Sequence, residues 1–188
     1  FYSGENYSGN KTYNSPKEFA EQLRENIDVV TLANNHIWDY GYNGLKETNE
    51  YLQGIGMETC GVTPNNETSY QIIETKGVKI AFLAYTYNFD LENEETKKYI
   101  NIYEEERVKQ DIEKAKEESE YICVLMHWGD ISTNKVNSEQ ENIANFLISE
   151  GVDMILGSHP GVVQKMEIKQ NKEGKNILVA YSLGNFLA

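Results

Sequence analysis

Short runs of consecutive apolar residues alternate along the chain with segments in which apolar residues recur every three or four positions. Continuous apolar runs are typical of strands buried on both faces, whereas the wider spacing is typical of helices with one apolar face. The runs that predict buried strands are residues 28–33, 121–126 and 152–156. The segments that predict helices are residues 15–26, 43–53, 104–118 and 138–150.

Two further pairs of apolar segments are joined by short polar turns that contain glycine, which is the pattern of a β-hairpin. The pairs are 71–75 with 78–85, and 162–169 with 176–182. Residues 90–98 are highly charged and predict a loop. Strands that alternate with helices, with hairpins adding antiparallel strands, indicate an α/β fold with a layered sheet. Because no repeat or internal linker is visible, we expect residues 1–188 to form a single domain.

The chain is strongly acidic, with 17 basic and 30 acidic residues and a formal net charge of −13. A field of this sign repels nucleic acid and anionic lipid, and therefore argues against nucleic-acid binding. No apolar run approaches the ~20 residues of a transmembrane helix. Residues 1–11 also lack the pattern of a signal peptide. Because the chain starts without Met and stops after an apolar run, we expect it to be part of a longer protein.

The two cysteines of the chain, Cys60 and Cys123, both lie in apolar surroundings. Free cysteine is among the residue types most often buried, so this context predicts buried free thiols. Neither their number nor their spacing matches a zinc knuckle.

The chain holds three histidines, His36, His127 and His159, and each follows an apolar strand run within a few residues. Ligands and catalytic groups gather where the strands of an open α/β sheet end, so we expect these side chains at one edge of the sheet. Asn35 precedes His36, and Asp39 follows it on the same loop. Imidazole with amide or carboxylate oxygen suits zinc, manganese or iron, and a nearby carboxylate can hold the tautomer of a histidine. The set is too small for a closed structural zinc site and favours an open, catalytic one.

Two segments rich in small residues follow the later strands, at 157–161 and 182–186. Small residues allow the backbone to approach a ligand closely. These segments either complete the site or form ordinary turns, and the residues alone leave both interpretations open.

Residues 32–36, followed by Asp39, Tyr40 and Gly41, resemble the first shared motif of the CapA family of poly-γ-glutamate capsule biosynthesis proteins. Later segments resemble the family's other motifs in the same order: 127–129, 157–160 with 162–164, and 181–186. The resemblance covers most of the chain. It implies the fold of calcineurin-like metallophosphoesterases, a layered β-sandwich flanked by helices around a dinuclear metal centre, whose N-terminal part is missing from this chain.

The resemblance also implies roles for individual residues. Asn35, His127 and His159 match metal ligands, while His36 matches the proton donor of the superfamily and, with Asp39 beside it, forms the catalytic pair. The expected substrate-binding residues are Asn34, Trp128, Ser158 and Asn185. The implied cofactor is a divalent metal ion, manganese, zinc or iron, in the complete protein.

Three features depart from the family pattern. Gly161 stands where the family usually has a second histidine, and Asp130 and Ile131 stand where it usually has a glutamate at the second position. The family's early Gly-Asp and Asn-Leu-Glu segments would precede Phe1. The implied metal centre of this chain is therefore incomplete, and either mononuclear or empty.

Two classes of function follow from the resemblance and the histidines. The first is a capsule biosynthesis or export protein that acts as a metal-dependent, phosphoesterase-like hydrolase. The second is a non-catalytic cell-surface component of polymer assembly with a vestigial metal site, and a plain α/β binding domain is a third interpretation. The expected partners are an anionic polymer or phosphoester substrate and other capsule-synthesis membrane proteins. The family implies a location at the cell surface, with a membrane anchor in the complete protein.

Overall fold

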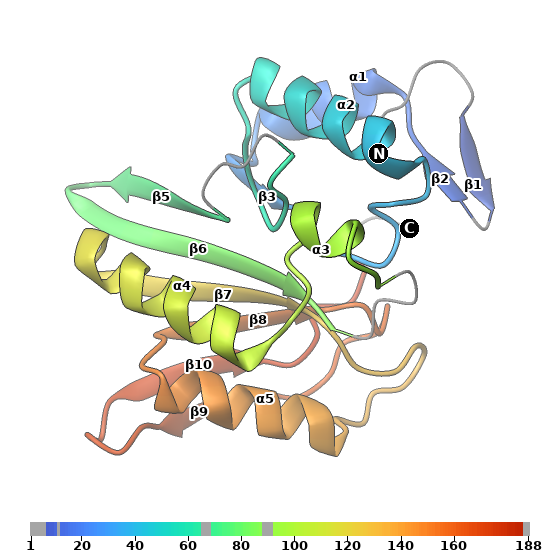
Figure 1. The fold of residues 1–188 in the computed structure, drawn as a ribbon. Coiled ribbons are helices and arrows are strands. Elements are labelled where there is room, and N and C mark those ends of the chain that lie inside the picture. Colours follow the sequence, from blue (N-terminus) through green and yellow to red (C-terminus); the bar gives the residue numbers. More distant parts are fainter. Residues whose placement is uncertain (1–6, 11, 65–68, 88–91, 186–188) are drawn as a thin grey trace.

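The computed structural model describes residues 7–10, 12–64, 69–87 and 92–185, and a six-stranded sheet is its largest element (Figure 1). Its strands are β5 Tyr70–Thr75, β6 Val78–Thr86, β7 Tyr121–His127, β8 Met154–Ser158, β9 Met166–Gln170 and β10 Asn176–Ala180. They are arranged in the order β5-β6-β7-β8-β10-β9. Residues 90 and 91 of the predicted loop, and Phe186 of the last sequence motif, lie outside the described residues.

The four inner strands of this sheet, β6, β7, β8 and β10, run parallel, and the two edge strands pair antiparallel with their neighbours. Parallel neighbours need a crossover connection, which is usually a helix. Helix α4 (Glu105–Glu118) connects β6 to β7, and α5 (Ser138–Ser149) connects β7 to β8. The edge pairs β5–β6 and β9–β10 confirm the two predicted hairpins.

The main hydrophobic core lies between one face of this sheet and the two helices that cover it, α4 and α5 (Figure 1). Leu83, Val124 and Ile155 reach it from the strands, and Ile112 and Leu147 from the helices. All five side chains are fully buried. Burying an aliphatic side chain of this size stabilises a fold by about 1.5–3 kcal/mol, so this face holds the large sheet rigid.

A second, smaller sheet covers part of the opposite face. It consists of β3 (Val29–Thr31) and β4 (Glu58–Cys60), which run parallel and are joined by α2 (Gly41–Gly54). Ala33, Cys60 and Ala84 pack between the two sheets. Helix α1 (Lys17–Arg24) lies beside α2 on the outside of the small sheet (Figure 1). The result is a central sheet flanked by helices in layers, which confirms the predicted α/β fold class.

The structure differs from two predictions about local structure. The strand expected at 28–33 is shorter, at Val29–Thr31, and its partner β4 was not expected because its residues do not form an apolar run. Within the segment predicted as a loop, Thr96–Tyr99 forms the short helix α3. The Asn93 side chain accepts hydrogen bonds from the backbone N–H groups of Glu95 and Thr96, and this local bonding starts the helix despite its charge.

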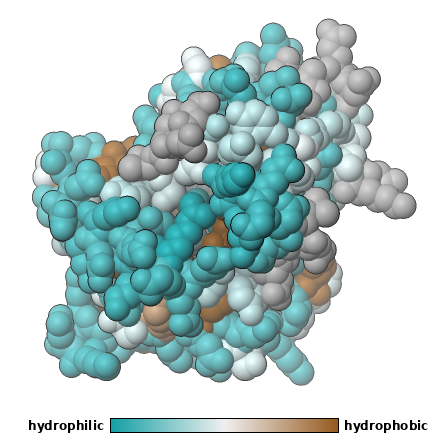
Figure 2. Space-filling view, in the orientation of Figure 1, coloured by the Kyte–Doolittle hydropathy of each residue, from teal (hydrophilic) through white to brown (hydrophobic). Residues whose placement is uncertain are grey.

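A small hairpin precedes α1 in the chain and consists of β1 (Ser8–Asn10) and β2 (Thr12–Asn14). Within the part of the chain that the structure describes, no helix is both long and apolar enough to cross a membrane. The face of the molecule shown in Figure 2 is mostly hydrophilic, and apolar residues show only in small separate areas. The large apolar side chains that are fully buried include Leu45, Leu83, Ile112 and Trp128.

Candidate metal and catalytic site

The ends of two neighbouring strands bring His127 and His159 together. His127 is the last residue of β7, its register partner on β8 is Ser158, and His159 follows directly. The Nδ1 atom of His159 lies 2.9 Å from the Nε2 atom of His127. From the loop after β3, the Oδ1 atom of Asn35 lies 3.0 Å from the same Nε2 atom. Three potential metal-ligating atoms from three separate segments therefore meet at one point.

His127 is held in its neutral form. Burial, together with the neighbouring imidazoles of His159 and His36, lowers the pKa of His127 from 6.5 to about 3. Its Nδ1 atom lies 3.3 Å from the hydroxyl oxygen of Ser158. Because the amide oxygen of Asn35 can only accept, Nε2 of His127 carries the proton in this hydrogen bond. To bind a metal ion through Nε2, the imidazole would carry its proton on Nδ1 instead, toward the Ser158 hydroxyl.

His36 and Asp39 form a second pair beside the first group. The Nδ1 atom of His36 lies 3.0 Å from Oδ2 of Asp39, and the His36 backbone N–H donates to Oδ1 of Asn34 at 2.9 Å. The Asp39 carboxylate also accepts a hydrogen bond from the backbone N–H of Tyr13 at 2.8 Å. The carboxylate therefore fixes Nδ1 of His36 and leaves Nε2 of that imidazole for other partners.

Tyr13 is a site residue that sequence reasoning missed. Besides the bond to Asp39, its ring meets the imidazole of His36 edge to face, with centroids 4.4 Å apart. It belongs to the hairpin β1–β2, which lies far before His36 in the chain. No motif marks this residue, so only the tertiary structure reveals the contact.

Asn35, His127 and His159, together with His36, line one open cavity of about 750 Å³. Asp39 contacts His36 and is not among the lining residues. The predicted site residues that line it are Asn34, Asn35, His36, His127, Ser158, His159 and Asn185. Among the lining residues that were not predicted are Tyr13, Ile131 and Ser132. The structure thus brings nearly all the predicted residues to one place, while their chemical roles remain predictions.

Trp128 is the exception, and its expected contact with substrate is wrong. Successive side chains of a strand point to opposite faces, so His127 in the cavity directs Trp128 toward the core. The Trp128 side chain is 1% exposed, and its indole N–H donates to the carbonyl oxygen of Tyr181 at 2.8 Å. Trp128 therefore packs in the core, on the side of the strand end that faces away from the cavity.

Backbone strain marks the turn that carries His159. This residue has a φ of 101°, a region that non-glycine residues rarely adopt, and such strain is found mostly at functional sites. Gly161, two residues later, has a φ of 72°. A histidine at this position would be strained in this backbone conformation.

The ligand types at the meeting point, two imidazoles and one amide oxygen, suit a borderline divalent metal. They fit one open metal position, because a closed structural site needs a fourth protein ligand. Among the described residues, no group of three or more His, Cys, Asp or Glu side chains is arranged to hold a metal ion. The carboxylate of Asp39 instead bonds to His36.

A family model and two curated relatives place this chain in the same protein family. The model of the family "Bacterial capsule synthesis protein PGA_cap" matches residues 2–188. The chain is 32% identical over 168 residues to the capsule biosynthesis protein CapA of Bacillus anthracis, covering 85% of this chain and 39% of that protein. It is 30% identical over 182 residues to the PGA biosynthesis protein CapA of Bacillus subtilis, covering 91% of this chain and 45% of that protein. The chain therefore spans less than half the length of these relatives.

Solved structures share the fold at low sequence identity. A protein assigned as a 5′-nucleotidase from Staphylococcus aureus has a TM-score of 0.55 and 13% identity, covering 92% of this chain and 41% of that chain. The sulfate thiohydrolase SoxB of Thermus thermophilus has a TM-score of 0.54 and 16% identity, covering 89% of this chain and 30% of that chain. These structural neighbours are metallophosphoesterase-like, and at this level of identity the likeness shows the fold alone.

Proposed function

Because this chain belongs to the bacterial capsule synthesis protein family, we propose that it serves capsule synthesis as a metal-dependent phosphoester hydrolase. The observation that carries the proposal is that Asn35 and His159 each lie within 3.0 Å of Nε2 of His127, beside the pair His36–Asp39. Metal ligands next to an oriented acid are the two parts that such hydrolysis needs.

Asn35, His127 and His159 would hold a manganese, zinc or iron ion. Such an ion, when bound, polarises a phosphoryl oxygen and lowers the pKa of a water molecule. The neutral state of His127 supports this role, since a protonated imidazole cannot be a ligand. The side chains of Asn34, Ser158 and Asn185 line the same cavity and are the proposed contacts of the substrate's phosphoryl and neighbouring oxygens.

His36 would act as the general acid. When both ring nitrogens carry a proton, the Asp39 carboxylate accepts the hydrogen bond from Nδ1 and stabilises the positive charge. The proton on Nε2 can then pass to the leaving-group oxygen as the phosphoester bond breaks. Tyr13 supports the pair from the hairpin, through its backbone N–H and its ring.

The wider setting follows from the family. We propose an anionic polymer of the poly-γ-glutamate type or a phosphoester intermediate as the substrate, and other capsule-synthesis membrane proteins as partners. The complete protein would work at the cell surface through a membrane anchor. The net charge of −13 supports a role for metal and imidazole groups in bringing an anionic substrate to this protein.

Two alanine variants of the complete protein test the assignment. His36→Ala should leave the metal content unchanged and reduce hydrolysis of p-nitrophenyl phosphate by about 10²–10⁴, the usual contribution of a general acid. His127→Ala should instead lower metal occupancy, measured by elemental analysis after dialysis. Lys109→Ala, on the exposed side of α4, is the control for both.

A non-catalytic polymer-binding component is the second candidate. It is favoured by the absence, among the described residues, of a cluster of three His, Cys, Asp or Glu side chains suited to a metal. In that case both variants would retain the wild-type metal content and capsule synthesis. Equal metal loss in the two variants would instead make His36 a ligand.

A further inference from the structure

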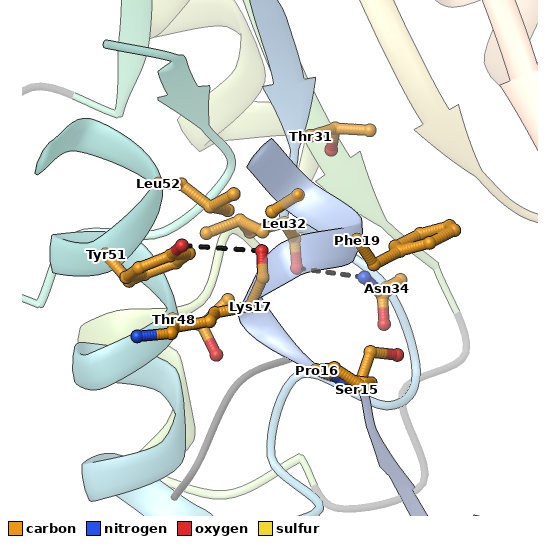
Figure 3. Close-up of a pocket in the computed structure, with 11 residues that line it drawn as sticks. Ser15, Pro16, Lys17, Phe19, Thr31, Leu32, Asn34, Thr48, Tyr51 and Leu52 are labelled. Carbon is orange, nitrogen blue, oxygen red and sulfur yellow. Dashed lines mark hydrogen bonds between the residues drawn. The ribbon is translucent and has the colours of Figure 1, made fainter. Parts of the chain in front are cut away.

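A second cavity, of about 250 Å³, lies beneath α1, between this helix, α2 and the end of β3 (Figure 3). Its walls are largely apolar, and the apolar residues that line it are Pro16, Phe19, Ala20, Leu32 and Leu52. The Tyr51 hydroxyl on α2 lies within hydrogen-bond distance of two acceptors on α1, the Glu21 carboxylate at 2.9 Å and the carbonyl oxygen of Lys17 at 3.3 Å. Figure 3 shows the second contact, which links α2 to the start of α1.

Helix α1 itself is incompletely packed. It has apolar residues on one side, yet none of its residues is buried, and Phe19 is 47% exposed. A helix with one apolar face normally buries that face against a core. Here the face of α1 lies over the cavity, so part of its apolar surface has no protein partner among the described residues.

This second cavity continues from the histidine cavity. Ser15, Thr31 and Asn34 line both. Asn34 stands between them, because its Oδ1 atom accepts from the His36 backbone and its Nδ2 atom donates to the Leu32 carbonyl oxygen. A molecule that reacts beside His36 could therefore extend past Asn34 into the space beneath α1.

The far end of the second cavity carries a positive charge. Lys17 is the only charged side chain among the described residues that line it. In Figure 3 the shared residues Ser15, Thr31 and Asn34 lie on one side, and Lys17 extends toward Thr48 on the other. In a chain of net charge −13, a lysine at this place favours an anionic group at the end opposite the histidines.

We propose that the cavity beneath α1 is a substrate subsite for a short aliphatic chain that ends in a carboxylate. The methylene groups lie against the apolar walls, the carboxylate meets the ammonium group of Lys17, and the phosphoester end of the same molecule reaches the histidine cavity. At about 250 Å³ the space is at the small end of ligand cavities and accepts one amino-acid-sized unit rather than a nucleotide. This inference rests on the proposed phosphoester hydrolysis for its reactive end.

Binding alone tests the subsite without any reaction. Glutarate, a dicarboxylate with three methylene groups, should shift the methyl NMR signals of Ala20, Leu32 and Leu52 when titrated into the complete protein. Lys17→Gln should weaken this binding by up to about fivefold, the upper limit for an ion pair with an exposed lysine. Ala20→Leu, which fills the cavity, should abolish the shifts. Lys109→Gln, a lysine on α4 outside both cavities, should change nothing.

Kinetics then test the link between subsite and reaction. Lys17→Gln should raise KM for 5-phosphonooxypentanoate by up to about fivefold and leave KM for pentyl phosphate and p-nitrophenyl phosphate unchanged. Ala20→Leu should raise KM for both pentyl compounds but not for p-nitrophenyl phosphate. Equal effects of Lys17→Gln on the compounds with and without the carboxylate would overturn the subsite.

The failure of the subsite and the failure of the hydrolase can be told apart. Absence of methyl shifts with glutarate, while p-nitrophenyl phosphate is still hydrolysed, would overturn the subsite and keep the proposed function. Methyl shifts with glutarate, without hydrolysis of any phosphomonoester, would support the carboxylate site and overturn the hydrolase.

Discussion

Two regions of this molecule differ in how completely their apolar side chains are buried. The large-sheet region, which consists of β5–β10 with α4 and α5, has a continuous core with strands and helices fully buried on one face. The N-terminal layer, which consists of α1, α2, β3 and β4, has strands of three residues and a helix, α1, without a buried residue. The first region buries the apolar residues of this face throughout, whereas burial in the second is uneven: Leu45 of α2 is fully buried, and α1 has no buried residue.

The candidate site lies where these two regions meet. The large-sheet region supplies His127 and His159 from neighbouring strand ends, and the N-terminal layer supplies Asn35, His36 and Asp39 from one loop. A rigid sheet edge thus positions two of the proposed ligands, whereas the acid and the walls of the second cavity come from the loosely packed side. The proposed hydrolysis requires residues of both regions in their correct positions. Destabilising the N-terminal layer should therefore reduce its rate before the large-sheet region unfolds.

The largest expected effect compares the same substitution in the two regions. Leu147→Ala on α5 should lower the free energy of unfolding by about 3 kcal/mol, because the side chain is fully buried and a cavity remains. Leu23→Ala on α1 should lower it by less than about 1 kcal/mol, since this side chain is only partly buried. Urea unfolding monitored by circular dichroism measures both, and equal losses would refute the difference in packing.

A second prediction concerns the loop of the N-terminal layer. Asp39→Asn should reduce the rate of phosphomonoester hydrolysis about 10–100-fold, the usual effect of losing a carboxylate that orients a histidine. The amide still accepts the backbone N–H of Tyr13, so the midpoint of unfolding should stay within about 1 °C of wild type. A large loss of stability with an unchanged rate would make Asp39 a structural residue.

The strained turn of the large-sheet region offers a third, smaller effect. His159→Gly should be more stable than His159→Ala by about 1 kcal/mol, because glycine adopts the φ of 101° without the penalty of a side chain. Both variants remove the imidazole and should lose metal equally. Identical unfolding free energies would show that the turn relaxes once the histidine is gone.

A fourth prediction uses pH to test the burial of the two thiols, one of which lies between the regions. Burial raises the pKa of the Cys60 and Cys123 thiols from 9.0 to about 12. Between pH 9 and 12 the unfolded thiols ionise while the folded ones keep their protons, so stability falls as the pH rises through this range. The double variant Cys60→Ala with Cys123→Ala should show a shallower decline in unfolding free energy.

Thiol labelling gives the matching kinetic measurement. Because only the thiolate reacts, both cysteines should stay unlabelled by a thiol reagent at pH 8 in the native protein and react after unfolding in urea. Cys60 lies between the small sheet and the large one, so it should be labelled first if the layers separate. Rapid labelling of the native protein would contradict the burial of these side chains.

Much of the large-sheet region was predictable from the chain. The continuous apolar runs at 121–126 and 152–156 became β7 and β8, and the periodic segments that precede them, 104–118 and 138–150, became α4 and α5. Other parts were predicted less well. In the N-terminal layer β4 was missed, and in the connection between β6 and α4 a charged segment formed α3 through the side chain of Asn93. Secondary structure can be predicted where burial in a core sets the hydrophobic pattern. It cannot be predicted from that pattern where local hydrogen bonds determine the structure.

The site divides in the same way. The position of each histidine after a strand follows from the sequence alone, since the parallel strands of one sheet end at one edge. Only the tertiary structure decided that Nε2 of His127 faces both Asn35 and His159, that Tyr13 contacts Asp39, and that Trp128 points into the core. The hydrophobic pattern of the sequence predicts which helices and strands are buried and where each of them ends. Strand register, side-chain alternation and the packing of distant segments determine which atoms meet, and these are set only when the layers assemble.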